Sequence, residues 1–320
     1  MTSYTSYQEN NFKLFDITDP LYVQSDDIFH SKKFIQDEIQ ADPVTNFLKL
    51  SKFRKNIVMA GDYVASMVDP LVEHHRDDTV QELYIFGNAR EVRLATRDLI
   101  SIVKRYMRNC DIGYVLLDPN ETNEKDKIIL SIVIHFHDYL YPVVINPTRC
   151  PDMRSVVNTM LTTCQQVVVS YQFKVPRVLG TKRFIDAFRT NKINITTNKT
   201  DLSVAEIQTI SNLSYLHGLD VPKAFEDLLV EYQDSMDWFQ PRKDFKFGKS
   251  KYEVMLRWPD ADYYQFFHTR FTVDQIYNCI RRFLVRETPR NKSLEDQLQD
   301  VTEEMNEDQI EEDLPELIPN

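Results

Sequence analysis

An apolar strand that leads through a glycine turn into a short helix constrains the fold more than any other part of the chain. Residues 57–59 are apolar and predict a buried strand, and Gly61 with Asp62 marks the turn into the helix. A second strand follows, and Glu82 and Tyr84 share one of its faces because side chains alternate along a strand. The sequence therefore predicts a strand–helix–strand unit in this part of the chain.

The net charge of the chain comes from one end. The 320 residues carry a formal charge of −11, from 49 acidic and 38 basic residues. Residues 295–316 contain 11 of the acidic residues and no Lys or Arg, so residues 1–294 are formally neutral. An acidic balance argues against nucleic acid as a partner, but here it applies to the acidic tail alone.

Cysteine usage and hydropathy indicate the compartment. The four cysteines are scattered without a Cys-x-x-Cys pair, which is typical of reduced thiols in an intracellular protein. The chain opens on polar residues rather than on a signal peptide, and its apolar runs are too short to span a bilayer. We therefore expect a soluble intracellular protein without a membrane partner.

Hydrophobic periodicity and capping residues predict the remaining elements. Asp42 and Asn88 are expected to cap helices, and the longest helix has an apolar stripe of Val92, Ala95, Leu99, Ile102, Val103 and Tyr106. The predicted helices cover residues 31–40, 43–54, 89–108, 151–161, 181–190, 203–217, 222–233 and 273–286, and a short helix ends the strand–turn–helix stretch 56–68. Further strands are predicted at 112–117, 127–137, 140–146, 167–171 and 193–197, the first two as a hairpin.

This order of elements resembles divergent polymerase-beta-like nucleotidyltransferase-fold proteins of large DNA viruses. The resemblance covers roughly residues 45–220 and rests on five stretches: Ala60 to Val64, Tyr84 to Gly87, Tyr141 to Asn146, Cys164 to Tyr171 and Arg177 to Ile185. It implies an α/β (α+β) fold with a mixed central sheet flanked by helices. It also implies that strands 57–59, 82–86 and 141–146 are neighbours in that sheet.

The resemblance also implies that the catalytic carboxylates are not retained. The family's acid-x-acid pair, which holds a divalent metal, falls on Glu82 and Tyr84, and the third carboxylate falls on 141–146, which contains none. Asp62 follows Gly61 where a small residue would face the phosphates. Gly61, Asp62, Glu82 and Tyr84 are thus interpreted as degenerate site positions, with no catalytic residue, metal or cofactor predicted.

Four segments are expected along the chain. Residues 1–44 form an N-terminal arm and helix, and 45–200 form the degenerate nucleotidyltransferase-like domain. Residues 201–290 form a mainly helical C-terminal region, and 291–320 form an acidic, disordered tail. Spaced apolar residues in the tail favour an alternative, in which it docks onto a protein partner or onto a basic surface.

Basic residues interleaved with phenylalanines form a second candidate site, for nucleic acid or phosphate. The candidate contacts are Lys174, Arg177, Lys182, Arg183, Arg189 and Lys192. The alternative is an amphipathic helix that buries Phe184, Ile185 and Phe188 and exposes a solvated basic face.

Three functional hypotheses follow from these patterns. The first is a non-catalytic viral interaction or assembly protein, associated with the virion or with replication and found in the host cytoplasm, nucleus or virion. The second is a nucleic-acid-binding module that uses residues 174–192. The third and weakest is an active metal-dependent nucleotidyltransferase that uses Asp62, Glu82 and His135 or His137, although two histidines two apart also suit the polar face of a strand.

Overall fold

The structure is a computed structural model, and the residues that it describes lie in eight stretches of the chain. These residues are 13–17, 28–72, 80–106, 110–116, 129–136, 143–172, 175–196 and 204–222. They lie within residues 1–284, and residues 285–320 form a second unit. Within the described part of the chain, no helix is long and apolar enough to cross a membrane.

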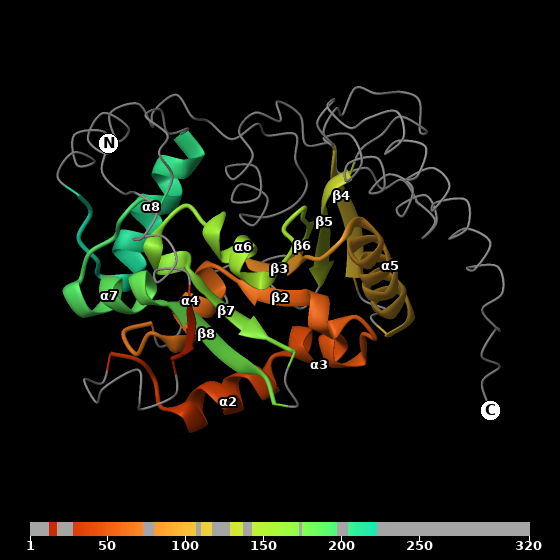
Figure 1. The fold of residues 1–320 in the computed structure, drawn as a ribbon, viewed down its shortest axis with the longest axis horizontal. Coiled ribbons are helices and arrows are strands. Elements are labelled where there is room, and N and C mark those ends of the chain that lie inside the picture. The colour runs from red at the N-terminus through yellow and green to blue at the C-terminus, as the bar shows by residue number, and fades with distance from the viewer. Residues whose placement is uncertain are drawn as a thin grey trace. The chain divides into compact units, whose positions relative to one another are not determined.

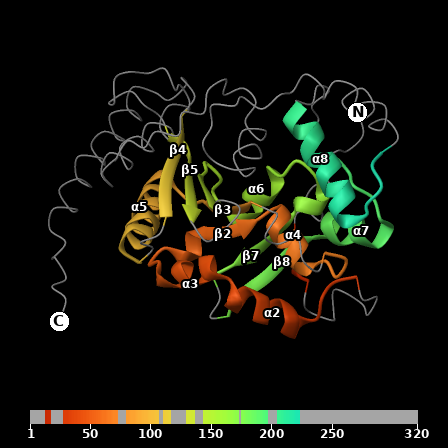
Figure 2. The same ribbon diagram turned by 180° about the vertical axis from the view of Figure 1, so that it is seen from behind.

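Eight strands form one mixed sheet (Figures 1 and 2). They are β1 (Leu14–Asp16), β2 (Ile57–Ala60), β3 (Gln81–Ile85), β4 (Cys110–Leu116), β5 (Ile129–Phe136), β6 (Val143–Pro147), β7 (Val167–Ser170) and β8 (Arg177–Thr181). The order across the sheet is β1-β8-β7-β2-β3-β6-β5-β4. The predicted neighbours, β2, β3 and β6, are therefore adjacent, as the resemblance implied.

Helices connect these strands and cover both faces of the sheet. They are α2 (Lys32–Ala41), α3 (Pro43–Leu50), α4 (Asp62–Val68), α5 (Ala89–Tyr106), α6 (Met153–Asn158), α7 (Lys182–Thr190) and α8 (Val204–His217), with the short 3-10 turns η1 (Arg54–Asn56) and η3 (Thr163–Gln165). The predicted fold class, a mixed central sheet flanked by helices, is confirmed. Apart from α8, the predicted helical C-terminal region and the acidic tail lie outside the described residues.

Strands β3 and β6 run parallel, whereas the other pairs in the described sheet are antiparallel. A parallel pair needs a crossover connection, and here the chain between the two strands contains α5 and the β4–β5 hairpin. The pairing sets Tyr84 opposite Val58 on β2 and opposite Asn146 on β6. This register places Tyr84 and Asn146 side by side in one row across the sheet.

Alternation along each strand divides the apolar side chains between two cores. On β2, Ile57 and Met59 belong to the larger core, to which α2, α3, α4, α5, α7 and α8 contribute side chains. Val58 and Ala60 belong to the smaller core, together with Val156 and other residues of α6. Since β2 is buried on both faces, its sequence is continuously apolar rather than alternating.

Polar residues begin the helices as the sequence predicts. Asp42 caps α3, where its Oδ1 accepts from the backbone N–H of Val44 at 2.7 Å, and Pro43 occupies the first helical position. Asn88 and Glu91 form a reciprocal cap at α5, each side chain accepting from the other's backbone N–H at 2.9 Å. These caps fix where α3 and α5 start beside the sheet.

Three expectations about the elements are wrong. Residues 193–196, the described part of the strand predicted at 193–197, do not form a strand, because Ile195 makes only an isolated bridge with Thr162. Tyr106, expected in the apolar stripe of α5, is 56% exposed at the last turn of the helix. Helix α3 ends at Leu50, which is 54% exposed, because the chain turns at Ser51.

Candidate functional site

Gly61 connects β2 to α4 at the predicted degenerate site. Its backbone has φ +85° and ψ −149°, a conformation that is almost restricted to glycine. A Cβ atom on Gly61 would lie 3.2 Å from Oε2 of Glu82. The glycine thus lets the backbone turn directly beside a carboxylate on the neighbouring strand.

Glu82 and Tyr84 lie on one face of β3 and contact each other. The hydroxyl of Tyr84 donates a hydrogen bond to Oε2 of Glu82 at 3.1 Å. Glu82 is only 4% exposed, whereas Tyr84 is partly exposed and packs against the smaller core. The hydroxyl group of Tyr84 and the carboxylate of Glu82 therefore interact directly.

Asp62 interacts with the turn before β7. Its Oδ1 accepts a hydrogen bond from Nε2 of Gln165 at 2.7 Å, and Oε1 of Gln165 accepts from the backbone N–H of Thr162 at 3.0 Å. Burial raises the pKa of the neighbouring Cys164 thiol to about 12, and the negative charge of Asp62 adds to this shift. At this pKa the thiol is a neutral group at physiological pH and not a nucleophile.

Two polar residues that the sequence did not single out extend the row of side chains across β6 and β5. Asn146 lies opposite Tyr84, and its Oδ1 accepts a hydrogen bond from Oγ of Ser131 at 2.6 Å. Both side chains are buried. An Asn at the end of an apolar strand is a signal in the sequence, but its proximity to Tyr84 depends on the parallel pairing of β3 with β6.

The other two candidate residues for metal binding are not joined to this row. His135 pairs through its backbone with Asp111 on β4, and His137 lies outside the described residues. Among the described residues, no group of three or more His, Cys, Asp or Glu side chains is placed to hold a metal ion.

The residues predicted to contact nucleic acid are spread along β8 and α7. Arg177 begins β8 and Lys182 follows its last residue, so about 16 Å of extended chain separates them. Arg183 is partly buried, and Lys182, Arg189 and Lys192 are exposed. Lys174 lies outside the described residues. The alternative of an amphipathic helix agrees with α7, since Phe184, Ile185 and Phe188 are buried.

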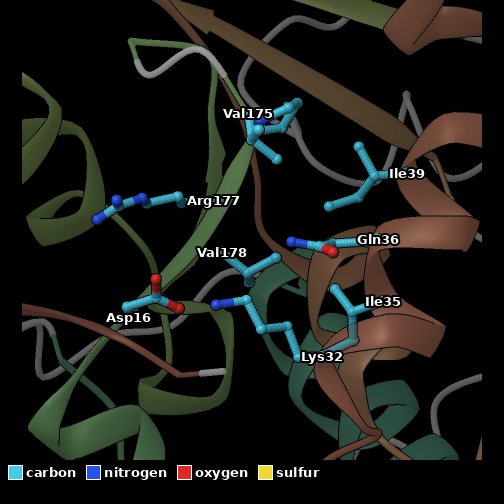
Figure 3. A pocket seen from close by; sticks show the side chains of 9 residues that line it. Asp16, Lys32, Ile35, Gln36, Ile39, Val175, Arg177 and Val178 are labelled. Atoms are coloured by element: carbon cyan, nitrogen blue, oxygen red, sulfur yellow. The ribbon is translucent and has the colours of Figure 1, made fainter. Parts of the chain in front are cut away.

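Arg177 also lines a pocket between α2 and the β1–β8 edge (Figure 3). The pocket has a volume of about 240 Å³, and Ile35, Ile39 and Val178 form its apolar part. Figure 3 shows the Lys32 side chain extending toward Asp16, while the guanidinium group of Arg177 points away from α2. Side chains of opposite charge thus line the pocket.

Solved structures of CCA-adding enzymes are similar to this chain. An apo form has 16% identity and a TM-score of 0.41, covering 73% of this chain and 55% of that chain. The Thermotoga maritima CCA-adding enzyme complexed with tRNA has 14% identity and a TM-score of 0.42, with the same coverage. A tRNA-processing enzyme in an apo form has 12% identity and a TM-score of 0.40, covering 78% of this chain and 58% of that chain.

The chain spans about half the length of these solved structures. No protein-family model matches it, and no curated protein matches it.

Proposed function

We propose that this chain is a non-catalytic protein built on a nucleotidyltransferase-like fold, which acts in interaction or assembly. The observation that carries this proposal is the hydrogen bond from the Tyr84 hydroxyl to Glu82. In this role the protein is a viral component associated with the virion or with replication. Its acidic tail, residues 291–320, docks onto a protein partner.

The chemistry of the metal site supports a non-catalytic role. Two divalent cations in a nucleotidyltransferase align the attacking hydroxyl and the leaving pyrophosphate, and carboxylates hold them. A tyrosine hydroxyl is neutral at physiological pH and here donates a hydrogen bond to Glu82, so it competes with a cation for that carboxylate. Asp62 adds a negative charge beside the turn that would face the phosphates of a nucleotide.

Calorimetry with a nucleoside triphosphate and Mg²⁺ tests this proposal. The wild-type protein is expected to give no saturable heat. Tyr84→Asp, which restores the acid-x-acid pair, is expected to bind Mn²⁺ measurably, whereas Tyr84→Phe is the matched control that removes the hydroxyl without adding a charge. Saturable nucleotide binding by the wild type that Glu82→Gln abolishes would instead identify an active metal-dependent enzyme.

Nucleic-acid binding through residues 174–192 is a second candidate function. The observation that favours it is the placement of Lys182 and Arg189 on α7. They are seven residues apart, which puts them on the same side of the helix, and both are exposed. This function predicts salt-dependent binding that strengthens when residues 293–320 are removed. If neither the full-length nor the shortened protein binds DNA or RNA at low salt, this function is excluded.

A further inference from the structure

The pocket between α2 and the β1–β8 edge of the sheet is separate from Glu82 and Tyr84, which do not line it (Figure 3). Its volume is about 240 Å³. Pockets that hold drug-sized ligands measure roughly 300–1,000 Å³, so this pocket suits a smaller molecule. Its lining divides into an apolar part and a polar part, and this division determines which ligand chemistry fits.

Three aliphatic side chains form the apolar part of the pocket, which we call the aliphatic wall. Ile35 and Ile39 lie one turn apart on α2, and Val178 comes from β8. All three are at most 2% exposed, because they also belong to the larger core. Branched side chains packed in a core change shape little, so the wall is a rigid surface. It matches a short aliphatic group, whose burial against the wall removes apolar surface from water.

The polar part of the pocket carries both signs of charge. Lys32 and Gln36 are four residues apart on α2 and therefore lie on the same side of the helix. Figure 3 shows both side chains reaching from α2 toward β8, with Lys32 extending toward Asp16. Asp16 is the last residue of β1 and lines the same pocket. The pocket thus offers an ammonium group and an amide from α2, and a carboxylate from β1.

Both charged groups are available to a ligand. Lys32 is exposed, so a molecule entering from solvent can reach its ammonium group. Asp16 already interacts with other groups of the protein, but an ionised carboxylate has about four acceptor positions and can accept a further N–H group. Arg177 also lines the pocket, but its guanidinium group points away from α2 in Figure 3. A ligand in the pocket therefore meets one positive and one negative group.

Each wall of the pocket is held by contacts of its own. Helix α2 is capped by Ser31, whose Oγ accepts from the backbone N–H of Phe34 at 3.3 Å, and it packs against α3 and α4. Strand β1 pairs with β8, and just beyond it the backbone N–H of Ile17 donates to the carbonyl of Val178 at 3.1 Å. The pocket is thus preformed, which lowers the entropy lost when a ligand binds.

We propose that this pocket binds a small zwitterion, namely a free α-amino acid with a short branched aliphatic side chain such as leucine. The ligand side chain packs against the aliphatic wall, the carboxylate accepts from Lys32 and Gln36, and the α-ammonium group donates to Asp16. A ligand with a carboxylate alone would be repelled by Asp16, and one with an amine alone would be repelled by Lys32. A zwitterion makes both interactions attractive.

This binding site does not depend on the chemistry at Glu82. The aliphatic wall belongs to the larger core, whereas Tyr84, which contacts Glu82, packs against the smaller core on the other face of the sheet. Failure of the amino-acid proposal would therefore leave the non-catalytic function proposed above unaffected, and the reverse also holds.

Isothermal titration calorimetry with the full chain tests the proposal. L-Leucine is titrated into the wild type, into Lys32→Gln and into Lys33→Gln, a matched control that removes an exposed cation outside the pocket lining. The wild type is also titrated with 4-methylpentanoate, which lacks the ammonium group, and with 3-methylbutylamine, which lacks the carboxylate. Val175→Trp fills the pocket from a position that is 52% exposed, so it replaces no core residue. Circular dichroism establishes that each variant is folded.

The wild type and Lys33→Gln are expected to bind leucine saturably and with equal affinity. Lys32→Gln, and both analogues on the wild type, are expected to bind about tenfold more weakly or worse, because each removes a charge-assisted hydrogen bond. Val175→Trp is expected to abolish binding. Absence of leucine binding to the wild type at millimolar concentration would overturn the proposal. Equal affinity for 4-methylpentanoate would overturn the zwitterion, and unchanged binding by Lys32→Gln or Val175→Trp would overturn the location.

Discussion

Replacing Asp42 by alanine is the most informative test of how the N-terminal helices are held on the sheet. Asp42 is 4% exposed, and its Oδ1 caps α3 through Val44 and Thr45. Its Oδ2 accepts from the hydroxyl of Tyr63 at 2.5 Å and from Nε2 of Gln81 at 3.3 Å. One side chain therefore joins α3, α4 and β3.

The magnitude follows from these contacts. Loss of the helix cap costs about 1 kcal/mol. The Tyr63 hydroxyl, left buried without its acceptor, costs about 1–3 kcal/mol more. The Gln81 contact is long and adds little. Asp42→Ala should thus lower the free energy of unfolding by about 2–4 kcal/mol, a large share of the roughly 5–15 kcal/mol typical of a domain.

Asp42→Asn separates the charge from the hydrogen bonds. The substitution keeps an oxygen atom for the helix cap. Among the described residues Oε1 of Gln81 has no hydrogen-bond partner, so the side-chain amide of Gln81 can rotate and accept a hydrogen bond from the introduced amide nitrogen. Asp42→Asn should therefore cost less than Asp42→Ala at neutral pH.

The pH dependence has a defined sign. Burial raises the pKa of Asp42, against the lowering effect of its hydrogen bonds. Because the pKa of Asp42 is higher in the folded state than in the unfolded state, protonation of Asp42 stabilises the fold. This stabilisation is fully present below the unfolded-state pKa and is lost as the pH rises through the folded-state pKa. The difference in unfolding free energy between wild type and Asp42→Asn should thus be largest in acid and shrink toward neutral pH.

Urea unfolding followed by far-UV circular dichroism at several pH values measures both effects. A cost for Asp42→Ala below about 1 kcal/mol would refute the assignment of Asp42 as a shared buried acceptor. A wild-type-minus-Asn difference that grows toward neutral pH would refute the raised pKa.

Three other outcomes are expected. Gly61→Ala should lower the free energy of unfolding by about 1–3 kcal/mol, because Gly61 has a backbone conformation that is almost restricted to glycine. Gly218→Ala should lower it by only about 1 kcal/mol, because nothing lies within 4 Å of the added Cβ atom. Urea unfolding that finds Gly218→Ala the more destabilising of the two would contradict this. Phe184→Ala should lower the free energy of unfolding by about 3–5 kcal/mol, because the ring is fully buried and stacks on Phe29. The exposed-site substitution Tyr215→Ala is the control, and an equal shift in thermal unfolding for the two variants would count against this prediction. Burial raises the pKa of Cys164 to about 12, so the thiol should not react with a thiol reagent at about pH 8 while the protein is folded. Peptide mapping should find Cys164 modified only after unfolding. Modification of Cys164 in the native protein as fast as that of the partly exposed Cys110 would disprove this.

Short-range patterns made the centre of the fold predictable from sequence. The period of two along β3 placed Glu82 and Tyr84 on one face, and the glycine turn at Gly61 placed the start of α4. Their assignment as degenerate positions of an enzyme stays a prediction. The hydrogen bond between Asn146 and Ser131 was not predictable, because it depends on strand pairings set by distant parts of the chain.

The misinterpretation of residues 193–196 as a strand has a physical cause. The alternation at Ile193, Asn194 and Ile195 is typical of a strand, but the backbone N–H of Ile193 bonds to the carbonyl of Asp220 rather than to a strand of the sheet.

The pairing of β1 with β8 bears on how the chain is made. Phe15 lies opposite Gly180, so the first strand waits for more than 160 residues of synthesis before its partner exists. At roughly 5–20 residues per second this delay lasts on the order of 10 to 30 seconds. During that time β1 has no strand of the sheet to pair with, and an unpaired strand edge is a site for pairing with other chains. Vectorial synthesis therefore makes β1 the strand at which chaperones or neighbouring nascent chains would first compete with native folding.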